Sequence, residues 1–117
     1  MRATGPSRKT RRLVIDRDGG VCRMCGRAGT NVHHRRPRGM GGTRDPETNS
    51  PANLVLLCGS GTTGCHGWIE SHRAEAMAAG WLVSKWADPS TTPIKTSRGV
   101  IRLTDHGTII TIGEKDG

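Results

Sequence analysis

Four cysteines in two pairs constrain the fold of this 117-residue chain more than any other feature of its sequence. Cys22 and Cys25 form a C-x2-C pair, and Cys58 and Cys65 form a second pair spaced C-x6-C. Two such pairs on separate turns can bring four thiolates to one tetrahedral zinc ion. Two disulfides, or one redox-active C-x2-C pair, are the alternatives. We see no export signal and no βαβ pattern around the cysteines, so the spacing favours structural zinc.

A metal would also supply stability that the apolar core lacks. Only 32% of the residues are hydrophobic, and the chain has three Trp but no Phe and no Tyr. Small domains bury proportionally less surface than large ones. We therefore expect folding to depend on the zinc, which would join the N-terminal segment to residues 54–79. Trp68, Trp81 and Trp86 are expected in the core, with base stacking by one of them as the alternative.

Basic residues gather in the first part of the chain. Residues 1–44 hold 12 of the 18 Lys and Arg side chains, and only 2 of the 10 acidic ones. Eleven of these 12 are Arg, which suits bidentate phosphate contacts better than Lys does. The asymmetry favours a polyanionic partner, most simply nucleic acid. A solvated basic surface is the alternative.

Helix formers, apolar runs and glycines predict an α+β fold in three parts. Residues 1–7 are predicted to be a flexible basic leader, 8–86 the main domain, and 87–117 a linker with a C-terminal β-hairpin extension. We expect helices over 8–18 and 66–79, strands over 31–34 and 53–58, an extended segment over 81–86 and a hairpin over 100–112. A long Gly- and Pro-rich loop, 35–51, joins the first two strands, and loops of this length are usually functional or disordered.

Membrane insertion and export are not indicated by the sequence. No run of residues approaches the roughly 18 apolar residues of a membrane span. We therefore expect a cytoplasmic protein without a membrane partner. The sequence does not indicate an oligomeric state.

Histidines and one asparagine occur where the predicted elements begin or end. His33 and His34 close the first strand, Asn53 opens the second, and His66 and His72 lie on the following helix. Phosphodiester hydrolysis needs a divalent cation that neutralises the charge developing on the phosphate. It also needs a base that takes a proton from water, and a group that orients this base. A histidine, with an ordinary pKa of about 6.5, can be that base at neutral pH. The arrangement is typical of a metal-dependent nuclease.

These residues, together with both cysteine pairs, resemble the HNH endonucleases, which have the ββα-metal fold. The resemblance covers residues 20–86 and is most specific over 33–72. The run RRPRGMGG after the histidine pair, and the run from Ser50 to Trp68, look especially like HNH proteins of actinobacteria and their phages. The resemblance implies a small zinc-stapled ββα-metal (HNH) fold with an N-terminal helix and a C-terminal β-hairpin.

The resemblance also implies roles for single residues. His34 would be the general base that activates water, and Asn53 would hold the loop and orient His34 through a backbone hydrogen bond. His33 and His66 would bind a catalytic divalent metal. Glu70 lies four residues after His66 on the same helical face, where some family members carry a third histidine ligand. A carboxylate favours Mg²⁺ or Mn²⁺, whereas imidazole favours Zn²⁺ or Ni²⁺.

Two residues of the predicted helix keep a second interpretation. Glu70 could equally face solvent without binding a metal. His72 lies on a different helical face from Glu70, where it could contact phosphate, the outer shell of the metal, or solvent alone.

Basic side chains near the predicted site are candidates for DNA contacts. They are Arg35, Arg36 and Arg38 directly after His34, and Arg8, Lys9, Arg11 and Arg12 in the first helix. Phosphate contacts give position and salt-sensitive affinity but little sequence information, so we expect low sequence specificity. A solvated surface is the alternative for each of them.

The sequence therefore predicts an HNH endonuclease that nicks or cuts DNA with a structural Zn²⁺ and one catalytic divalent metal. Phage proteins of this kind often act beside the terminase, so terminase or portal components in a host cytoplasm are candidate partners. A host-defence or mobile-element nuclease fits equally well. A non-catalytic zinc module that binds nucleic acid is the rival class, but it gives no reason for the histidines and Asn53 to occur together. A thiol redox protein that uses Cys22 and Cys25 is the third hypothesis.

Overall fold

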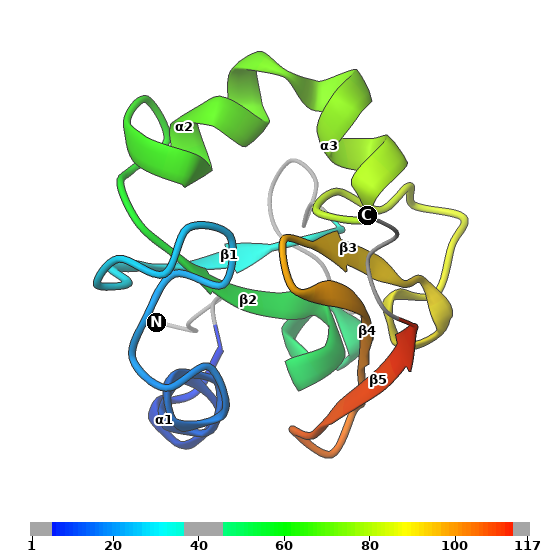
Figure 1. Ribbon diagram of the computed structural model, residues 1–117. Helices are drawn as coiled ribbons and strands as arrows, with labels where there is room; N and C mark the ends of the chain where they lie inside the picture. Colours follow the sequence, from blue (N-terminus) through cyan, green and yellow to red (C-terminus); the bar gives the residue numbers. More distant parts are fainter. Residues whose placement is uncertain (1–5, 37–45, 114–117) are drawn as a thin grey trace.

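Helix α1 (Arg8–Arg17) opens the computed structural model, which describes residues 6–36 and 46–113 (Figure 1). The Ser7 hydroxyl accepts a hydrogen bond from the Thr10 N–H at 3.1 Å, which is a typical helix N-cap. The helix ends before Gly19 and Gly20, whose φ angles of 69° and 73° are ones that only glycine adopts readily. The predicted helix over 8–18 is confirmed to within one residue.

An antiparallel hairpin follows the cysteine-bearing turn at residues 22–25. Strand β1 (Asn31–His34) pairs with β2 (Leu54–Leu57), with His34 opposite Leu54. Both strands lie where the sequence predicts them. All four residues of β2 are buried, as expected for a short apolar strand covered on both faces. Two short 3-10 helices, η1 (Pro46–Asn49) and η2 (Pro51–Asn53), lead into β2.

The single helix predicted over 66–79 is in fact two helices. Helix α2 (Gly64–Ser71) ends at His72, whose φ of −130° and ψ of 53° are not helical, and α3 (Arg73–Ala79) follows at once. The His72 ring stacks on Trp68 and its Nδ1 lies 3.0 Å from the Trp68 carbonyl oxygen. The Ser71 hydroxyl also donates to that carbonyl, at 3.1 Å. The Ser71 hydroxyl, the His72 ring and the His72 N–H thus all gather at the Trp68 carbonyl oxygen where α2 ends.

A three-stranded antiparallel sheet forms the C-terminal part. Its order is β3 (Ile94–Thr96), β4 (Gly99–Leu103) and β5 (Ile109–Gly113). The predicted hairpin corresponds to β4 and β5, whereas β3 was not predicted because three residues give too short an alternating pattern. The segment 81–86 is not a strand, and a short 3-10 helix, η3 (Pro89–Thr91), follows it.

One apolar core joins the two sheets with helices α2 and α3. Its members include Val55 and Leu57 of β2, Ile69 of α2, and Ile94, Ile101 and Leu103 of the C-terminal sheet. Trp81 belongs to this core with 4% of its surface exposed, but Trp68 is 38% and Trp86 86% exposed. The prediction that all three Trp residues lie in the core is therefore confirmed for Trp81 alone and wrong for Trp68 and Trp86, the latter of which lies in a turn.

Parts of three predicted segments lie outside the described residues. They are residues 1–5 of the leader, residues 37–45 of the Gly-rich loop, Arg38 among them, and residues 114–117 of the C-terminal extension. In the part of the chain that is described, no helix combines the length and apolar character needed to cross a membrane. The chain is thus a small α+β domain with three α-helices and two antiparallel sheets in its described residues.

Candidate functional site

The four cysteines come together although they lie on three separate segments. Cys22 and Cys25 lie on the turn after α1, Cys58 follows β2, and Cys65 lies in the first turn of α2. Their four sulfur atoms all lie within 4.8 Å of one another, and none of the cysteines forms a disulfide. The Cys65 N–H donates to the Cys58 sulfur at 3.4 Å, and this bond, with hydrogen bonds from the other cysteines, lowers the pKa of Cys58 to about 7. The cluster can hold a metal such as zinc, whose ligand is the thiolate.

Two glycines let the longer C-x6-C spacing close on itself. Gly59 and Gly64 have φ angles of 87° and 62°, and a Cβ on Gly59 would lie 2.0 Å from the Thr63 carbonyl oxygen. The Ser60 N–H donates to that same carbonyl at 3.0 Å. The six residues between the cysteines thus fold into a tight loop, which returns Cys65 to the side of Cys58.

A second cluster contains His33 of β1 with His66 and Glu70 of α2. One ligand atom from each of the three side chains lies within 4.8 Å of the others. The two imidazole rings meet edge to face, with centroids 5.1 Å apart. The sequence therefore predicted a set of residues that the structure does bring together, from a strand and a helix about 30 residues apart along the chain.

The hydrogen bonds of His33 leave one nitrogen for a ligand. His33 Nε2 lies 2.9 Å from the Trp81 carbonyl oxygen, and since a carbonyl can only accept, Nε2 carries the proton and Nδ1 the lone pair. Burial lowers the pKa of His33 to about 4, so the imidazole is neutral at pH 7, as a metal ligand must be. A protein carbonyl that fixes the tautomer in this way is typical of ligand histidines.

His66 supplies the observation that best tests whether a metal fits this cluster. Its Nδ1 is buried and has no hydrogen-bond partner, although buried polar atoms are nearly always paired. A cation held with His33 and Glu70 would satisfy this nitrogen. Glu70 is bonded to Arg73 at 3.0 Å, but both side chains are exposed, so the pair is weak and costs little to break.

Asn53 and His34 are connected through Thr48 and Asn49. His34 Nε2 lies 2.8 Å from Asn49 Oδ1. The Asn53 amide donates to the carbonyls of Thr48, at 2.8 Å, and Arg36, at 3.1 Å, and its Oδ1 accepts from the Arg36 N–H at 2.7 Å. Asn53 thus ties together the two described ends of the 37–45 segment. It fixes Thr48, whose neighbour Asn49 bonds the His34 ring.

Two functional contributors escaped the sequence analysis. Asn49 lies in the run Thr-Asn-Ser, where asparagine is an ordinary turn residue and carries no special pattern. The other is the backbone carbonyl of Trp81, and a backbone group cannot be predicted from the residue type. His72, in contrast, is exposed and stacked on Trp68, and it is not part of the His33 cluster.

Arg35 is not a DNA contact, contrary to the sequence prediction. Its residue is fully buried, and its guanidinium donates to four backbone carbonyls at 2.7 to 2.9 Å, those of Gly80, Ala52, Pro89 and Thr92. No phosphate can reach a group so enclosed. Arg36 is partly exposed and donates to the Ala87 carbonyl at 3.2 Å.

The basic residues of α1 are exposed but do not line the histidine cluster. Arg8, Lys9, Arg11 and Arg12 all lie on the solvent side of the helix. Figure 1 shows α1 on one side of the β1–β2 hairpin, and α2 and α3 on the other. The exposed basic residues of α1 thus lie on the side of the hairpin opposite α2.

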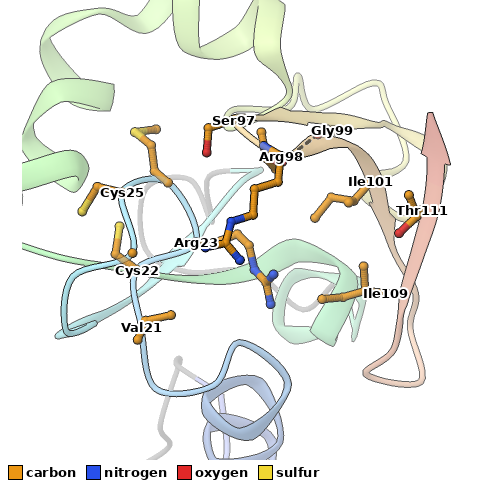
Figure 2. Close-up of a pocket in the computed structure, with 13 residues that line it drawn as sticks. Val21, Cys22, Arg23, Cys25, Ser97, Arg98, Gly99, Ile101, Ile109 and Thr111 are labelled. Atoms are coloured by element: carbon orange, nitrogen blue, oxygen red, sulfur yellow. Dashed lines mark hydrogen bonds between the residues drawn. The ribbon is translucent and has the colours of Figure 1, made fainter. Parts of the chain in front are cut away.

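A cavity of about 530 Å³ opens between the cysteine-bearing turn and the C-terminal sheet (Figure 2). Arg23 and Arg98 extend into it from opposite sides, and Ile101 and Ile109 form part of its wall. Arg23 also donates to the buried carboxylate of Asp18 at 2.8 Å. Cys22 and Cys25 also line this cavity.

Comparison with protein-family models, curated proteins and solved structures finds no match to this chain. The chain itself presents a four-cysteine cluster, a second cluster of two histidines and a carboxylate, and His34 next to this second cluster in the sequence. Such a set of groups can hold two metal ions, of which one lies beside a candidate base.

Proposed function

We propose that this chain is a metal-dependent endonuclease of the HNH type, with a ββα-metal fold, that hydrolyses DNA phosphodiester bonds. The observation that carries the proposal is the convergence of His33, His66 and Glu70. The hairpin β1–β2 followed by α2 supplies the ββα order that the family resemblance implies. The buried His66 Nδ1, which has no hydrogen-bond partner, supports a ligand at this residue.

The two clusters have different donor chemistry and would hold different metals. Four sulfur ligands suit a structural Zn²⁺, which would tie the turn after α1 to the end of β2 and the start of α2. Two imidazoles and one carboxylate leave coordination positions open and suit Mg²⁺, Mn²⁺, Zn²⁺ or Ni²⁺. When bound at the histidine cluster, a divalent ion would stabilise the charge that develops on the phosphoryl oxygens.

His34 has the role of general base in this proposal. Asn49 Oδ1 accepts a hydrogen bond from His34 Nε2, so the lone pair lies on Nδ1. Nδ1 would take the proton from the attacking water, and Asn49 would hold the ring in place while it does so. Asn53 positions this pair through Thr48, so we expect its removal to lower the rate without removing any reacting group.

DNA binding is proposed to be weakly sequence-specific, because phosphate contacts dominate the available chemistry. Arg36 next to the site, and the exposed Arg8, Lys9, Arg11 and Arg12 of α1, are the candidate contacts among the described residues. A place beside a phage terminase or portal, in the cytoplasm of a host, is one setting for such a nuclease. A defence or mobile-element role is the other.

The test is cleavage of supercoiled plasmid by zinc-loaded protein, with Mg²⁺, Mn²⁺, Ni²⁺ or Zn²⁺ supplied in turn. We expect nicked or linear product, and a loss of roughly 100-fold or more in rate in His34→Ala. His106→Ala is the matched control, since His106 is exposed in the turn between β4 and β5, and it should cleave like the natural chain.

Two results would contradict the proposal. Full activity in His34→Ala would refute the base assignment. DNA binding without cleavage under all four ions would favour the rival function, a non-catalytic zinc module that binds nucleic acid.

A further inference from the structure

Trp86 is the most exposed large apolar residue in the described part of the chain, with 86% of its surface open to solvent. Tryptophan is normally well buried, because its ring contributes more apolar area than any other side chain. This chain has only three aromatic residues of the Phe, Trp and Tyr type. Packing does not explain why one of these three side chains, Trp86, is exposed to solvent.

The segment that carries Trp86 runs beside the strand end that carries the histidine pair. His33 Nε2 bonds the Trp81 carbonyl at 2.9 Å. The Val83 N–H donates to the Arg35 carbonyl at 2.8 Å, and Arg36 donates to the Ala87 carbonyl at 3.2 Å. Residues 81–87 thus follow residues 33–36 step by step, which places Trp86 next to the residues that continue from His34.

The charges around Trp86 favour an anionic ligand that also has a flat apolar face. The Lys85 ammonium lies 4.8 Å from the centre of the Trp86 ring, and the Arg36 guanidinium bonds the carbonyl of the next residue. The nearby Asp88 carboxylate is engaged by the Ser90 N–H and hydroxyl at 2.9 and 2.8 Å. An open aromatic ring with cations beside it is the chemistry that binds unpaired nucleotides.

We propose that Trp86 is a stacking platform for an unpaired nucleobase, and that Lys85 contacts the phosphate next to it. The inference deepens the proposed endonuclease function, on which it rests, by naming the part of the substrate that is held: a base unstacked close to the cleaved bond. A protein partner fits less well, because the residues on either side of Trp86 are a lysine and an alanine. They offer no apolar surround of the kind that a protein hot spot needs.

The test uses the intrinsic fluorescence of tryptophan and single-stranded oligothymidylate as the probe, with zinc-loaded protein and no other divalent ion. Oligothymidylate should quench the emission of the natural chain and of Trp68→Phe, the matched control. The quenching should be largely lost in Trp86→Phe. Trp86→Ala should bind a labelled oligothymidylate about 5- to 150-fold more weakly. Trp86→Phe keeps a ring and should retain most of the affinity.

A fully paired duplex provides the comparison that isolates stacking. Its affinity should fall far less in Trp86→Ala than the affinity for the single strand, because paired bases are not free to stack on the ring. Equal losses for both ligands, or no loss for the single strand, would overturn the platform. Quenching that persists in Trp86→Phe would overturn it as well.

This experiment separates the two proposals. Plasmid cleavage with unchanged oligothymidylate binding in Trp86→Ala would refute the platform and leave the endonuclease standing. Quenching that depends on Trp86, in a protein that cleaves no DNA, would refute the endonuclease and leave the platform standing as part of a binding module.

Discussion

Replacing Arg35 by alanine should remove much of the stability of this domain, because its side chain joins three parts of the fold. The guanidinium is fully buried. It donates to Gly80 at the end of α3, to Ala52 in η2, and to Pro89 and Thr92 around η3, at 2.7 to 2.9 Å. Arg35 therefore links the segment that bonds His33 to the segment that precedes β2.

The size of the effect follows from the four carbonyls that would lose their donor. A buried acceptor left unpaired costs about 1 to 3 kcal/mol, so four of them set a gross loss of about 4 to 12 kcal/mol. Two effects reduce it: water can enter the vacated space, and burial lowers the pKa of Arg35 to about 10, which shows that the enclosed charge is itself unfavourable. We expect a net loss of about 4 kcal/mol, against a total of about 5 to 15 kcal/mol for domains of this kind.

Urea unfolding followed by circular dichroism, with zinc present, measures this loss. Arg35→Lys keeps the charge but not the planar fork of donors, so it should fall between the natural chain and Arg35→Ala. Arg27→Ala is the control, because Arg27 is exposed, and it should change the free energy of unfolding by less than about 0.5 kcal/mol. An Arg35→Ala protein within about 1 kcal/mol of the natural chain would refute the buried clamp and reopen a DNA contact at this position.

Three further predictions address the metal cluster, a buried charge and a helix end. Removal of zinc by a chelator should lower the melting temperature sharply and expose four reactive thiols, and an unchanged melt would contradict a structural role. Asp18→Asn should cost about 3 kcal/mol in urea unfolding. Burial raises the pKa of the Asp18 carboxyl, but hydrogen bonds from Arg17, Leu56 and Arg23 outweigh burial and hold this pKa below 3.8. The ionised carboxylate therefore stabilises the fold above that pH, and this stabilisation is lost as the pH falls through the lowered pKa. Asp18→Asn should flatten this acid limb of the stability profile. Gly80→Ala should destabilise the domain by more than about 1 kcal/mol, because Gly80 has a φ of 89° and its Cβ would meet the Pro93 carbonyl at 2.0 Å; Gly61→Ala, which meets nothing within 4 Å, should be neutral.

The four-cysteine cluster was predicted from the spacing of chemically distinctive residues, whereas the set of His33, His66 and Glu70 followed from the resemblance to HNH endonucleases. Two cysteine pairs indicate a four-sulfur site wherever the chain folds them together, and the structure does so. His66 and Glu70, four residues apart, share a helical face in any helix. The β1–β2 hairpin was equally predictable, since a short apolar run such as 54–57 has few other ways to be buried.

The sequence could not predict features that depend on long-range backbone contacts. Arg35 belongs to a run of arginines that looks like a basic patch, and only the four carbonyls brought in from distant segments show that it is buried. Asn49 holds His34 through a loop whose path no pattern fixes. The break at His72 lies between two runs of helix-forming residues, and no residue pattern in the sequence marks it.

The most direct test of the endonuclease proposal titrates Mn²⁺ into zinc-loaded protein and follows site occupancy and plasmid cleavage together. Electron paramagnetic resonance counts the bound Mn²⁺. We expect one site beyond the four-cysteine zinc, a cleavage rate that rises in proportion to its occupancy, and loss of both in His66→Ala at unchanged zinc content. A site that fills without any strand cleavage, or cleavage that is undiminished in His66→Ala, would contradict the proposed catalytic role of the His33, His66 and Glu70 cluster.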